Sequence, residues 1–384
     1  MRIGIDATNI GGGGGITHLK EILFYLNDII SDDKPLTLIV FGSENVLKEL
    51  PESNHVEKIT FSWLNKKIYH RIIFQVFYFD KEIKKRCDIL FSITGDYTGS
   101  FRPIISMSQN MLLYERKIWK EIKQPREIFR FWLIYQKQKR SFRNAAGIIF
   151  ISIYACEEVL KQFNLEEKAK TIIHHGISPR FQGPVKKQLL VSEFSFENPF
   201  RFLYVSTVHV YKHQWNLVQS VANLRTKGYP ISLDLVGGII YKPAGRRLTE
   251  TIQNFDPEGN FIHYHGHVPY NGIEKFYKDA NGIVYASTCE NMPNILIESM
   301  ASGVPIACSN KQPMPEFLKE NGYYFDAKNI CSIENALEQL LLNPERREQM
   351  AKNNLKEVKK FSWKKTTEQT FNFIERIYNE YNHV

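Results

Sequence analysis

The stretch Ser287-Thr-Cys-Glu-Asn-Met-Pro293-Asn294-Ile-Leu-Ile-Glu-Ser-Met-Ala-Ser-Gly303-Val-Pro305 decides the fold expected of this chain. A buried strand is predicted to end just before it. Pro293 and Asn294 can begin a helix, Gly303 can end that helix, and Pro305 can open the next strand. A strand, a loop, a helix and a second strand in this order are typical of a parallel sheet covered by helices.

Two carboxylates of this stretch have different predicted surroundings. Glu290 lies in the loop beyond the carboxyl end of the strand, where open α/β sheets bind ligands, and Glu298 lies about one turn into the helix. Amides of Asn294, Ile295 and Leu296 can meet a diphosphate, and the Glu298 carboxylate can accept hydrogen bonds from a vicinal diol such as a ribose. On spacing alone, a solvated Glu298 and a loop Glu290 without a ligand remain the alternative.

The same alternation of strands and helices extends along the rest of the chain. It is interrupted by a stretch without clear periodicity, 179–199, which we interpret as a linker between two α/β domains, residues 1–180 and residues 199–362. The predicted strands are Arg2–Ile5, Leu36–Phe41, Ile89–Phe91, Ile104–Met107, Gly147–Ile151, Phe202–Val205, Leu233–Val236, Phe261–His263, Gly282–Tyr285 and Pro305–Ala307.

Composition fits this architecture and excludes other classes. With 384 residues, of which 43% are apolar, the chain is neither a disordered tail nor a disulfide mini-protein. Its net charge of +9 suits acidic small molecules, anionic lipid or nucleic acid without choosing among them. The five scattered cysteines indicate reduced thiols, and Asp6 interrupts any signal peptide. We therefore expect a cytoplasmic protein whose membrane contact, if any, is peripheral.

A glycine run, Gly11–Gly15, follows the first strand and precedes a predicted helix, 16–27. Glycines such as Gly14 and Gly15 let the backbone approach an anionic ligand at a helix N-terminus. Two specific phosphate motifs fail here, because Ile16 replaces the third glycine of GxGxxG and no Lys-Ser/Thr follows. A plain flexible turn is the alternative.

These segments and others along the chain resemble a known family. Glu290-x7-Glu298 within the frame S-x-x-E-x-x-P-x-x-x-x-E-x-M-A-x-G-x-P is similar to the signature of retaining GT-B glycosyltransferases of the GT4 type, the glycosyl group 1 family. Other segments agree in order along essentially the whole chain: the glycine-rich loop, Ile173–Gly176 with Ile177 and Phe181, Tyr204–Lys212, Tyr264–Val268, Pro315-Glu316 and Phe361-Ser362-Trp363.

The resemblance implies a fold and roles for particular residues. It implies two Rossmann-like parallel-sheet domains facing each other across a cleft, with the C-terminal domain holding a nucleotide sugar and the last helix, 364–384, returning to the N-terminal acceptor domain. Glu298 would bind the donor ribose, Glu290 would face the donor sugar, and Lys212 would pair with the diphosphate, where a fixed cation stabilises the leaving group. The matching segments also place Gly14, Gly15, Thr207 and Val268 in the donor site.

One departure concerns the phosphate. The family commonly has an arginine five residues before the lysine, and this chain has Thr207 there. We interpret the replacement of arginine by Thr207 as divergence within a sub-branch of the family that carries the sequence Y-K-H-Q. His209, His213 and Arg246 are the candidate substitutes for the missing cation.

A second departure concerns the acceptor. Many relatives have a histidine after the fourth strand, whereas this chain has Gln109 and Asn110, which can hold hydroxyls but cannot act as general bases. In one route the departing phosphate oxygen takes the acceptor proton on the same face, and in the other a carboxylate forms a covalent intermediate. The sequence does not separate these routes. His18, after the glycine run, is a further acceptor-side candidate, with packing or solvation as its alternative.

Residues 116–143 form a basic and aromatic segment. Between Glu115 and Arg143 ten basic residues stand against three acidic ones, interleaved with aromatic side chains. Such a helical surface suits anionic lipid headgroups or a lipid-diphosphate acceptor. A core helix with a solvated basic face is the alternative, and nucleic-acid binding is disfavoured because no recognised reading module accompanies the charge.

These observations predict a retaining hexosyltransferase that uses a UDP-, GDP- or dTDP-sugar and a glycan or lipid-linked acceptor in surface polysaccharide (O-antigen or capsule) synthesis. No metal ion and no other cofactor are expected, because cations and helix ends neutralise the diphosphate. The alternatives are a nucleotide-sugar epimerase of the same fold and a peripheral protein that binds anionic membranes. The broken glycine motif argues against a NAD-dependent oxidoreductase. A function limited to binding would leave the two glutamates unexplained.

Overall fold

The computed structural model describes residues 1–11, 13–29 and 36–382 and forms two compact units. Unit 1 comprises residues 1–116, 123–176 and 361–384, and unit 2 comprises residues 117–122 and 177–360. Gly12 of the glycine run and residues 383–384 of the predicted last helix lie outside the described residues. The stretch predicted as a linker, 179–199, belongs to unit 2.

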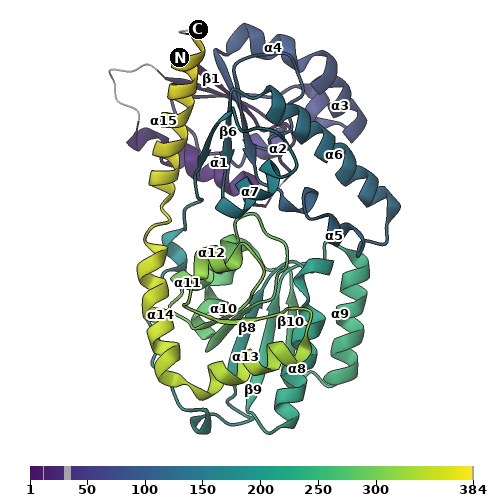
Figure 1. The fold of residues 1–384 in the computed structure, drawn as a ribbon, viewed down its shortest axis with the longest axis vertical. Coiled ribbons are helices and arrows are strands. Elements are labelled where there is room, and N and C mark those ends of the chain that lie inside the picture. Colours follow the sequence, from purple (N-terminus) through teal and green to yellow (C-terminus); the bar gives the residue numbers. More distant parts are fainter. Residues whose placement is uncertain (12, 30–35, 383–384) are drawn as a thin grey trace. The chain divides into compact units, whose positions relative to one another are not determined.

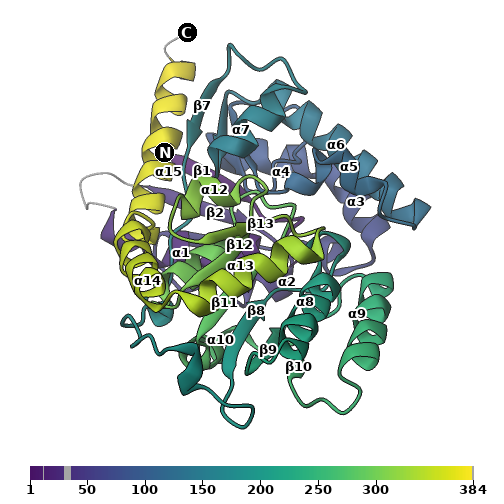
Figure 2. The same ribbon diagram turned by 60° about the horizontal axis from the view of Figure 1, so that its bottom comes forward.

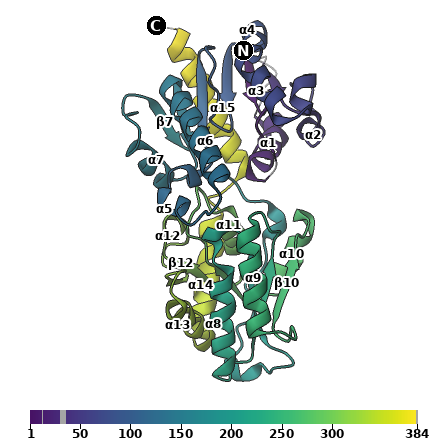
Figure 3. The same ribbon diagram turned by 90° about the vertical axis from the view of Figure 1, so that its right-hand side faces the viewer.

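Unit 1 contains a seven-stranded parallel sheet in the order β3-β2-β1-β4-β5-β6-β7. Helices cover both faces of this sheet (Figure 3). Its strands are β1 (Arg2–Asp6), β2 (Thr37–Phe41), β3 (Val56–Ile59), β4 (Ile89–Ser92), β5 (Ile104–Ser108), β6 (Gly147–Phe150) and β7 (Ala169–Ile172). The central strands are mostly apolar and buried on both faces, as a sheet covered on both sides requires.

The helices of unit 1 include the last helix of the chain, α15, which packs against α1 (Figure 1). They are α1 (Gly14–Phe24), α2 (Glu44–Leu47), α3 (Ile68–Phe77), α4 (Phe79–Arg86), α6 (Pro125–Asn144), α7 (Ile153–Leu160) and α15 (Trp363–Asn382). Helix α5 (Arg116–Trp119) begins at the last residue of a unit 1 segment and continues into unit 2. Residues 361–384 are therefore distant in sequence from the rest of unit 1 but belong to it.

Unit 2 contains a six-stranded parallel sheet in the order β10-β9-β8-β11-β12-β13. Its strands are β8 (Phe200–Val205), β9 (Ile231–Val236), β10 (Ile262–Gly266), β11 (Gly282–Tyr285), β12 (Ile306–Ser309) and β13 (Tyr323–Phe325). Its helices are α8 (Gln214–Thr226), α9 (Lys242–Phe255), α10 (Ile273–Asp279), α11 (Asn294–Ala301), α12 (Met314–Leu318), α13 (Ile330–Leu342) and α14 (Pro344–Val358), with α8 and α13 packed together (Figures 1 and 2).

Both sheets have a point where the strand order reverses. In unit 1 it lies between β1 and β4, and in unit 2 it lies between β8 and β11. The connections that leave two such neighbouring strands run to opposite sides of the sheet, which opens a crevice at their carboxyl ends. The loops after β8 and β11 are therefore where a ligand of unit 2 is expected.

The predicted class, two Rossmann-like parallel-sheet domains, is confirmed, and all ten predicted strands are present with shifts of up to three residues at their ends. Three strands were not predicted: β3, β7 and β13. In β3 and β7, the two edge strands of the unit 1 sheet, no residue is fully buried, and β13 has only three residues, so each lacks a buried apolar run. Among the described residues, no helix has both the length and the apolar character needed to cross a bilayer.

Candidate active site

The predicted strand–loop–helix–strand stretch forms as expected in unit 2. β11 is fully buried, its loop leads to Pro293 at the N-cap of α11, and α11 ends at Ala301. Gly303 then takes a positive φ of 71°, and a Cβ there would lie 2.4 Å from the carbonyl oxygen of Pro184. Glycine is thus required both by the backbone conformation and by this close approach. The turn at Gly303 follows the end of α11 and leads into β12.

Glu298 is a buried carboxylate held by tyrosines. It is 5% exposed, its Oε1 accepts a hydrogen bond of 2.9 Å from the Tyr270 hydroxyl, and the Tyr277 hydroxyl lies 3.5 Å from its Oε2. Burial raises the pKa of Glu298 to about 7, while the two tyrosines and the Arg180 guanidinium oppose that rise. The carboxylate therefore gains from any further hydrogen-bond donor, and a pair of ribose hydroxyls would supply two.

Glu290 and Lys212 lie together at the carboxyl ends of β11 and β8. The Lys212 ammonium is paired with Glu290 Oε1, and the Tyr285 hydroxyl donates to the same oxygen at 2.7 Å. Lys212 closes a short 3-10 turn, Val210–Lys212, and its carbonyl oxygen accepts from the Tyr204 hydroxyl at 2.9 Å. The cation and the carboxylate that the sequence predicts for the phosphate and the sugar are thus in direct contact.

The first turn of α11 offers fewer free amides than expected. The Asn294 amide donates to the Met292 carbonyl at 3.0 Å, and the Leu296 amide donates to the Pro293 carbonyl at 2.8 Å. Of the three predicted amides, this leaves Ile295 as the candidate phosphate donor. No acidic residue lies in this first turn, so nothing there opposes an anion.

The two histidines named as substitutes for the missing arginine are neutral at pH 7. Burial, followed by the charge of Lys212, lowers the pKa of His209 to about 4. Burial also lowers the pKa of His213 to about 4, with Lys328 and Arg247 acting in the same direction, and its Nε2 lies 2.9 Å from Thr288 Oγ1. Neither ring supplies a fixed cation.

Two arginines on α9 are exposed. Arg246 is the predicted substitute, and the guanidinium of its neighbour Arg247 lies 4.4 Å from the centroid of the Trp215 ring. Arg247 is also close enough to His213 to affect its pKa. Sequence reasoning missed Arg247, because only the folding of α9 beside α8 brings it near the loop that follows β8.

Thr207 and Val268 follow the carboxyl ends of β8 and β10, respectively. Thr207 is exposed and its carbonyl accepts from Gln214 Nε2 at 3.0 Å, while Val268 is half-buried. The loop after β9 passes close to Thr207: a Cβ at Gly237, whose φ is 146°, would lie 2.9 Å from the Thr207 nitrogen. The backbone around Thr207 is therefore fixed by its neighbours.

The acceptor-side candidates belong to unit 1, and so do Gly14 and Gly15, which were predicted for the donor site. Gly14 and Gly15 form the start of α1, and a Cβ at Gly15 would lie 3.5 Å from Gln109 Oε1, so the glycine run and the loop after β5 meet. Asn110 accepts from the Leu112 amide at 3.1 Å and so caps the short turn that follows it. The structure thus gives Asn110 a local structural partner and leaves Gln109 half-buried beside Gly15.

His18 is fully buried in unit 1. Its ring lies 4.7 Å from the His175 ring and 5.7 Å from the Trp363 ring, between α1 and the start of α15. Burial, followed by the charge of His175, lowers the pKa of His18 well below its usual value. His18 therefore packs against His175 and Trp363, as in the alternative to an acceptor contact.

Sequence reasoning missed a polar cluster at the carboxyl edge of the unit 1 sheet. Asn9 Nδ2 donates to Asp96 Oδ2 at 2.6 Å, and Thr94 Oγ1 donates to Asp96 Oδ1 at 2.5 Å. Beneath them, burial and the neighbouring Asp96 raise the pKa of Asp6 to about 6. The sequence signal was a short polar run after each of two buried strands, β1 and β4.

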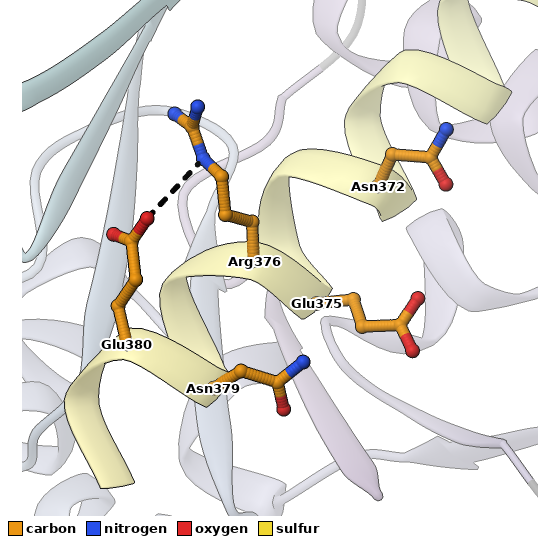
Figure 4. Close-up of a pocket in the computed structure, with 5 residues that line it drawn as sticks. All are labelled: Asn372, Glu375, Arg376, Asn379 and Glu380. Atoms are coloured by element: carbon orange, nitrogen blue, oxygen red, sulfur yellow. Dashed lines mark ion pairs between the residues drawn. The ribbon is translucent and has the colours of Figure 1, made fainter. Parts of the chain in front are cut away.

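The described residues contain no group of three or more histidine, cysteine, aspartate or glutamate side chains placed to hold a metal ion. Metal independence stays a prediction. A surface hollow on α15 is lined by one helix alone and contains the Arg376–Glu380 ion pair at 3.7 Å (Figure 4). It lies in unit 1 and contains none of the predicted site residues.

Residues 186–357 match the family model described as Glycosyl transferases group 1. The O-antigen chain mannosyltransferase B of Escherichia coli is 25% identical over 237 residues, which are 60% of this chain and 61% of that protein. The matched region thus spans about three fifths of the relative's length.

Solved structures share the fold of the whole chain. Sucrose-phosphate synthase from Thermosynechococcus elongatus superposes with a TM-score of 0.78 at 17% identity, covering 99% of this chain and 100% of that one. The Anabaena protein HepE in complex with UDP-glucose superposes with a TM-score of 0.71 at 15% identity, covering 100% of both chains. At these identities the likeness establishes the fold alone.

Proposed function

We propose that this chain, whose residues 186–357 match the Glycosyl transferases group 1 family model, transfers a hexose from a nucleotide diphosphate sugar with retention of configuration. The observation that carries the proposal is the pair of carboxylates supplied by one segment at the reversal point of the unit 2 sheet. Glu298 is buried against tyrosine hydroxyls, and Glu290 is paired with Lys212. One ligand with a diol at one end and a diphosphate-linked sugar at the other would satisfy both.

The proposed donor pose assigns each group a task. Glu298 accepts hydrogen bonds from the ribose hydroxyls, and the amide of Ile295 meets the diphosphate at the N-terminus of α11. Lys212 supplies the cation for the leaving diphosphate, whose negative charge grows as the bond to the sugar breaks. Glu290 then lies beside the sugar. Arg247 and Arg246 are the charged candidates for the role of the missing arginine.

We propose that the reaction proceeds on one face of the sugar. In this route the bond from the anomeric carbon to the diphosphate breaks, the acceptor oxygen bonds to the same carbon, and the acceptor proton passes to the departing phosphate oxygen. Glu290 is a poor nucleophile for the covalent route, because its Oε1 already accepts from both the Lys212 ammonium and the Tyr285 hydroxyl. Incubation with a 2-fluoro sugar donor followed by mass spectrometry tests this, since a glycosylated Glu290 peptide would contradict it.

The acceptor is proposed to be a glycan or a lipid-linked sugar of a surface polysaccharide. Two observations support this: the similarity to an O-antigen chain mannosyltransferase, and the basic residues exposed along α6, among them Arg126, Arg130 and Arg140. A phosphate-bearing lipid acceptor and the cytoplasmic face of an anionic membrane both suit such a surface. On this proposal the protein works in the cytoplasm, in peripheral contact with the membrane.

The deciding experiment is a thermal-shift screen with UDP-, GDP- and dTDP-sugars, followed by product analysis with the stabilising donor. A ligand at 100 times its Kd stabilises the folded state by about 2.7 kcal/mol, so one donor class should stand out. Glu298→Ala should abolish that shift, and Glu338→Ala, which removes another tyrosine-bound glutamate of unit 2, should retain it. Absence of stabilisation by all donors would overturn the proposal, and an epimerised donor in place of a glycosylated acceptor would favour the epimerase.

A further inference from the structure

Helix α3 presents an apolar face to solvent and a partly polar face to the protein. Successive residues of a helix advance by about 100°, so Ile68–Phe77 covers the circumference more than twice. Every exposed position of this helix is apolar or aromatic, with exposed fractions from 38% to 64%: Ile68, Tyr69, Ile72, Ile73, Val76 and Phe77. Surface helices normally have the opposite polarity. We call these six residues the α3 outer face.

The opposite side of α3 is firmly anchored in unit 1. Phe74 is buried, and its ring lies 4.7 Å from the Phe61 ring and 5.8 Å from the Phe79 ring. Gln75 Nε2 donates to Thr8 Oγ1 and to Asn9 Oδ1, each at 2.8 Å. The orientation of α3 is therefore fixed by contacts on its inner side, and rotating the outer face inward would break them.

The surroundings of the α3 outer face are basic and aromatic. No acidic residue occurs between Glu57 and Asp80, while Lys66, Lys67 and Arg71 lie at or beside the N-terminal end of α3. The Trp63 ring stacks on the Tyr78 ring at 5.7 Å, and the Lys66 ammonium lies 5.7 Å from the Trp63 ring. Tryptophan, tyrosine and lysine around an apolar helix face are the combination found at the boundary between lipid headgroups and acyl chains.

We infer that the α3 outer face inserts shallowly into a membrane that contains anionic lipids. Six large apolar side chains would leave water, and the flanking lysines and Arg71 would pair with lipid phosphates. The charge pattern selects this occupant over a second copy of the chain, since two α3 faces brought together would also bring their like-charged lysines together. Within unit 1, α3 lies at the edge of the ribbon, and its six outer-face side chains are exposed (Figure 1).

The position of α3 also connects membrane binding with the acceptor, and this part of the inference rests on the proposed function. Gln75 binds the loop after β1, where Asn9 donates to Asp96, and Gln138 of α6 donates to the Thr94 carbonyl at 3.1 Å after β4. Both helices are thus tied to the carboxyl edge of the unit 1 sheet. A membrane bound at α3 would hold a lipid-linked acceptor near that edge, where an open α/β sheet receives its ligand.

The test is flotation of the whole protein with vesicles of phosphatidylethanolamine and phosphatidylglycerol, compared with pure phosphatidylcholine. The triple variant Ile68→Ser, Ile72→Ser, Phe77→Ser should lower the partition coefficient on anionic vesicles on the order of 100-fold. A matched control, Phe24→Ser, Leu190→Ser, Leu342→Ser, removes one aromatic and two aliphatic exposed side chains elsewhere and should leave it unchanged. Lys66→Gln with Lys67→Gln should reduce the preference for anionic over zwitterionic vesicles.

Donor-induced thermal stabilisation, measured on the same variants, separates this inference from the proposed function. If the wild-type protein binds a donor but does not float with vesicles, the membrane inference fails and the proposed function stands. If it floats but no donor stabilises it, the proposed function fails and the membrane inference stands. A dimer in light scattering that the α3 triple variant converts to a monomer, without vesicle binding, would identify the face as a dimer interface and overturn the inference.

Discussion

The ammonium of Lys212 forms a largely buried ion pair with the carboxylate of Glu290, which lies 78 positions later in the chain. Each group is the other's counter-ion in a region where water screens charge poorly. A diphosphate that approaches Lys212 would therefore share the lysine with Glu290. This relationship determines what substitution of either residue does to stability and to turnover.

Lys212→Ala is expected to reduce turnover on the order of 10²-fold, the scale for removing one preorganised electrostatic group. It should also lower the free energy of unfolding by about 3 kcal/mol, because it leaves the Glu290 charge without its partner. The double variant Lys212→Ala, Glu290→Gln should recover most of that stability and none of the turnover. Urea unfolding and initial-rate measurements of both variants check this.

Lys227→Ala is the matched control for that cycle. Lys227 is half-exposed and pairs with Glu334 at 3.1 Å, so its loss should change the free energy of unfolding far less than the loss of Lys212 does. Normal turnover of Lys212→Ala would mean that another cation serves the diphosphate, and Arg247 would then be the first to test.

The affinity for the donor is expected to rise with pH through about 7. The ionised form of Glu298 accepts the ribose hydroxyls, and burial places the pKa of this carboxyl at about 7 in the folded protein. Below that pH a proton must leave before binding, so affinity falls by up to about tenfold per pH unit. Calorimetry from pH 5.5 to 8.5 in two buffers of different ionisation enthalpy should show proton release on binding.

Glu298→Gln gives the same experiment a second readout. The raised pKa makes ionisation of Glu298 unfavourable in the folded state, so this group lowers stability progressively as pH rises from about 4.5 to about 7. The glutamine variant should therefore bind donor weakly and without this pH dependence, and its stability relative to wild type should improve across that range. A pH-dependent affinity that survives in the variant would assign the titration to another group.

Tyr270→Phe should weaken donor binding by several-fold without unfolding the protein. It removes the 2.9 Å hydrogen bond to Glu298 and should raise the pKa of that carboxyl further, because one of the groups that favour its ionised form is lost. Tyr229→Phe is the control, since its hydroxyl donates to Glu338 at 2.7 Å away from the predicted site residues. Equal donor affinities for the two variants would show that Tyr270 does not support the ribose site.

The sequence predicted the parts of this protein that local patterns determine. β11, the loop and α11 follow from a buried apolar run, Pro293 and Gly303, and the carboxylates on them were located with it. Partners that come from other elements were not predictable: Tyr270 reaches Glu298 from 28 positions away, and Tyr285 shares Glu290 with Lys212. The hypothesis that His209 or His213 supplies a cation was wrong, because burial in the folded protein lowers the pKa of both rings. The extent of that burial could not be predicted from the local sequence.

Charge reversal at Arg126, Arg130 and Lys137 should reduce binding to anionic vesicles and leave the affinity for free nucleotide unchanged. These cations lie on α6 in unit 1, and each cation near an anionic surface contributes roughly 1 kcal/mol. The loss of vesicle binding should be large at low salt and small at high salt. The loss caused by substitutions in the α3 outer face should depend much less on salt. Reversal of Lys352, Lys356 and Lys359, exposed at α14, is the control. Unchanged vesicle binding would leave the α6 face as a solvated helix surface.

His18→Leu is expected to leave turnover unchanged and to preserve or increase stability. Within the described part of the chain neither ring nitrogen of His18 has a hydrogen-bond partner, so leucine removes a buried polar ring without breaking a bond. The depressed pKa of His18 means that the unfolded chain binds more protons, so wild-type stability falls as pH drops below about 6.5. The leucine variant should lose less stability on acidification, as calorimetry at pH 5 and pH 8 would measure.

His174→Leu, which removes a 3.0 Å contact between Nδ1 and the Ile151 carbonyl, should instead destabilise the protein. A stable His18→Leu variant with a lower kcat/KM for the acceptor would contradict the packing role and restore His18 to the acceptor side.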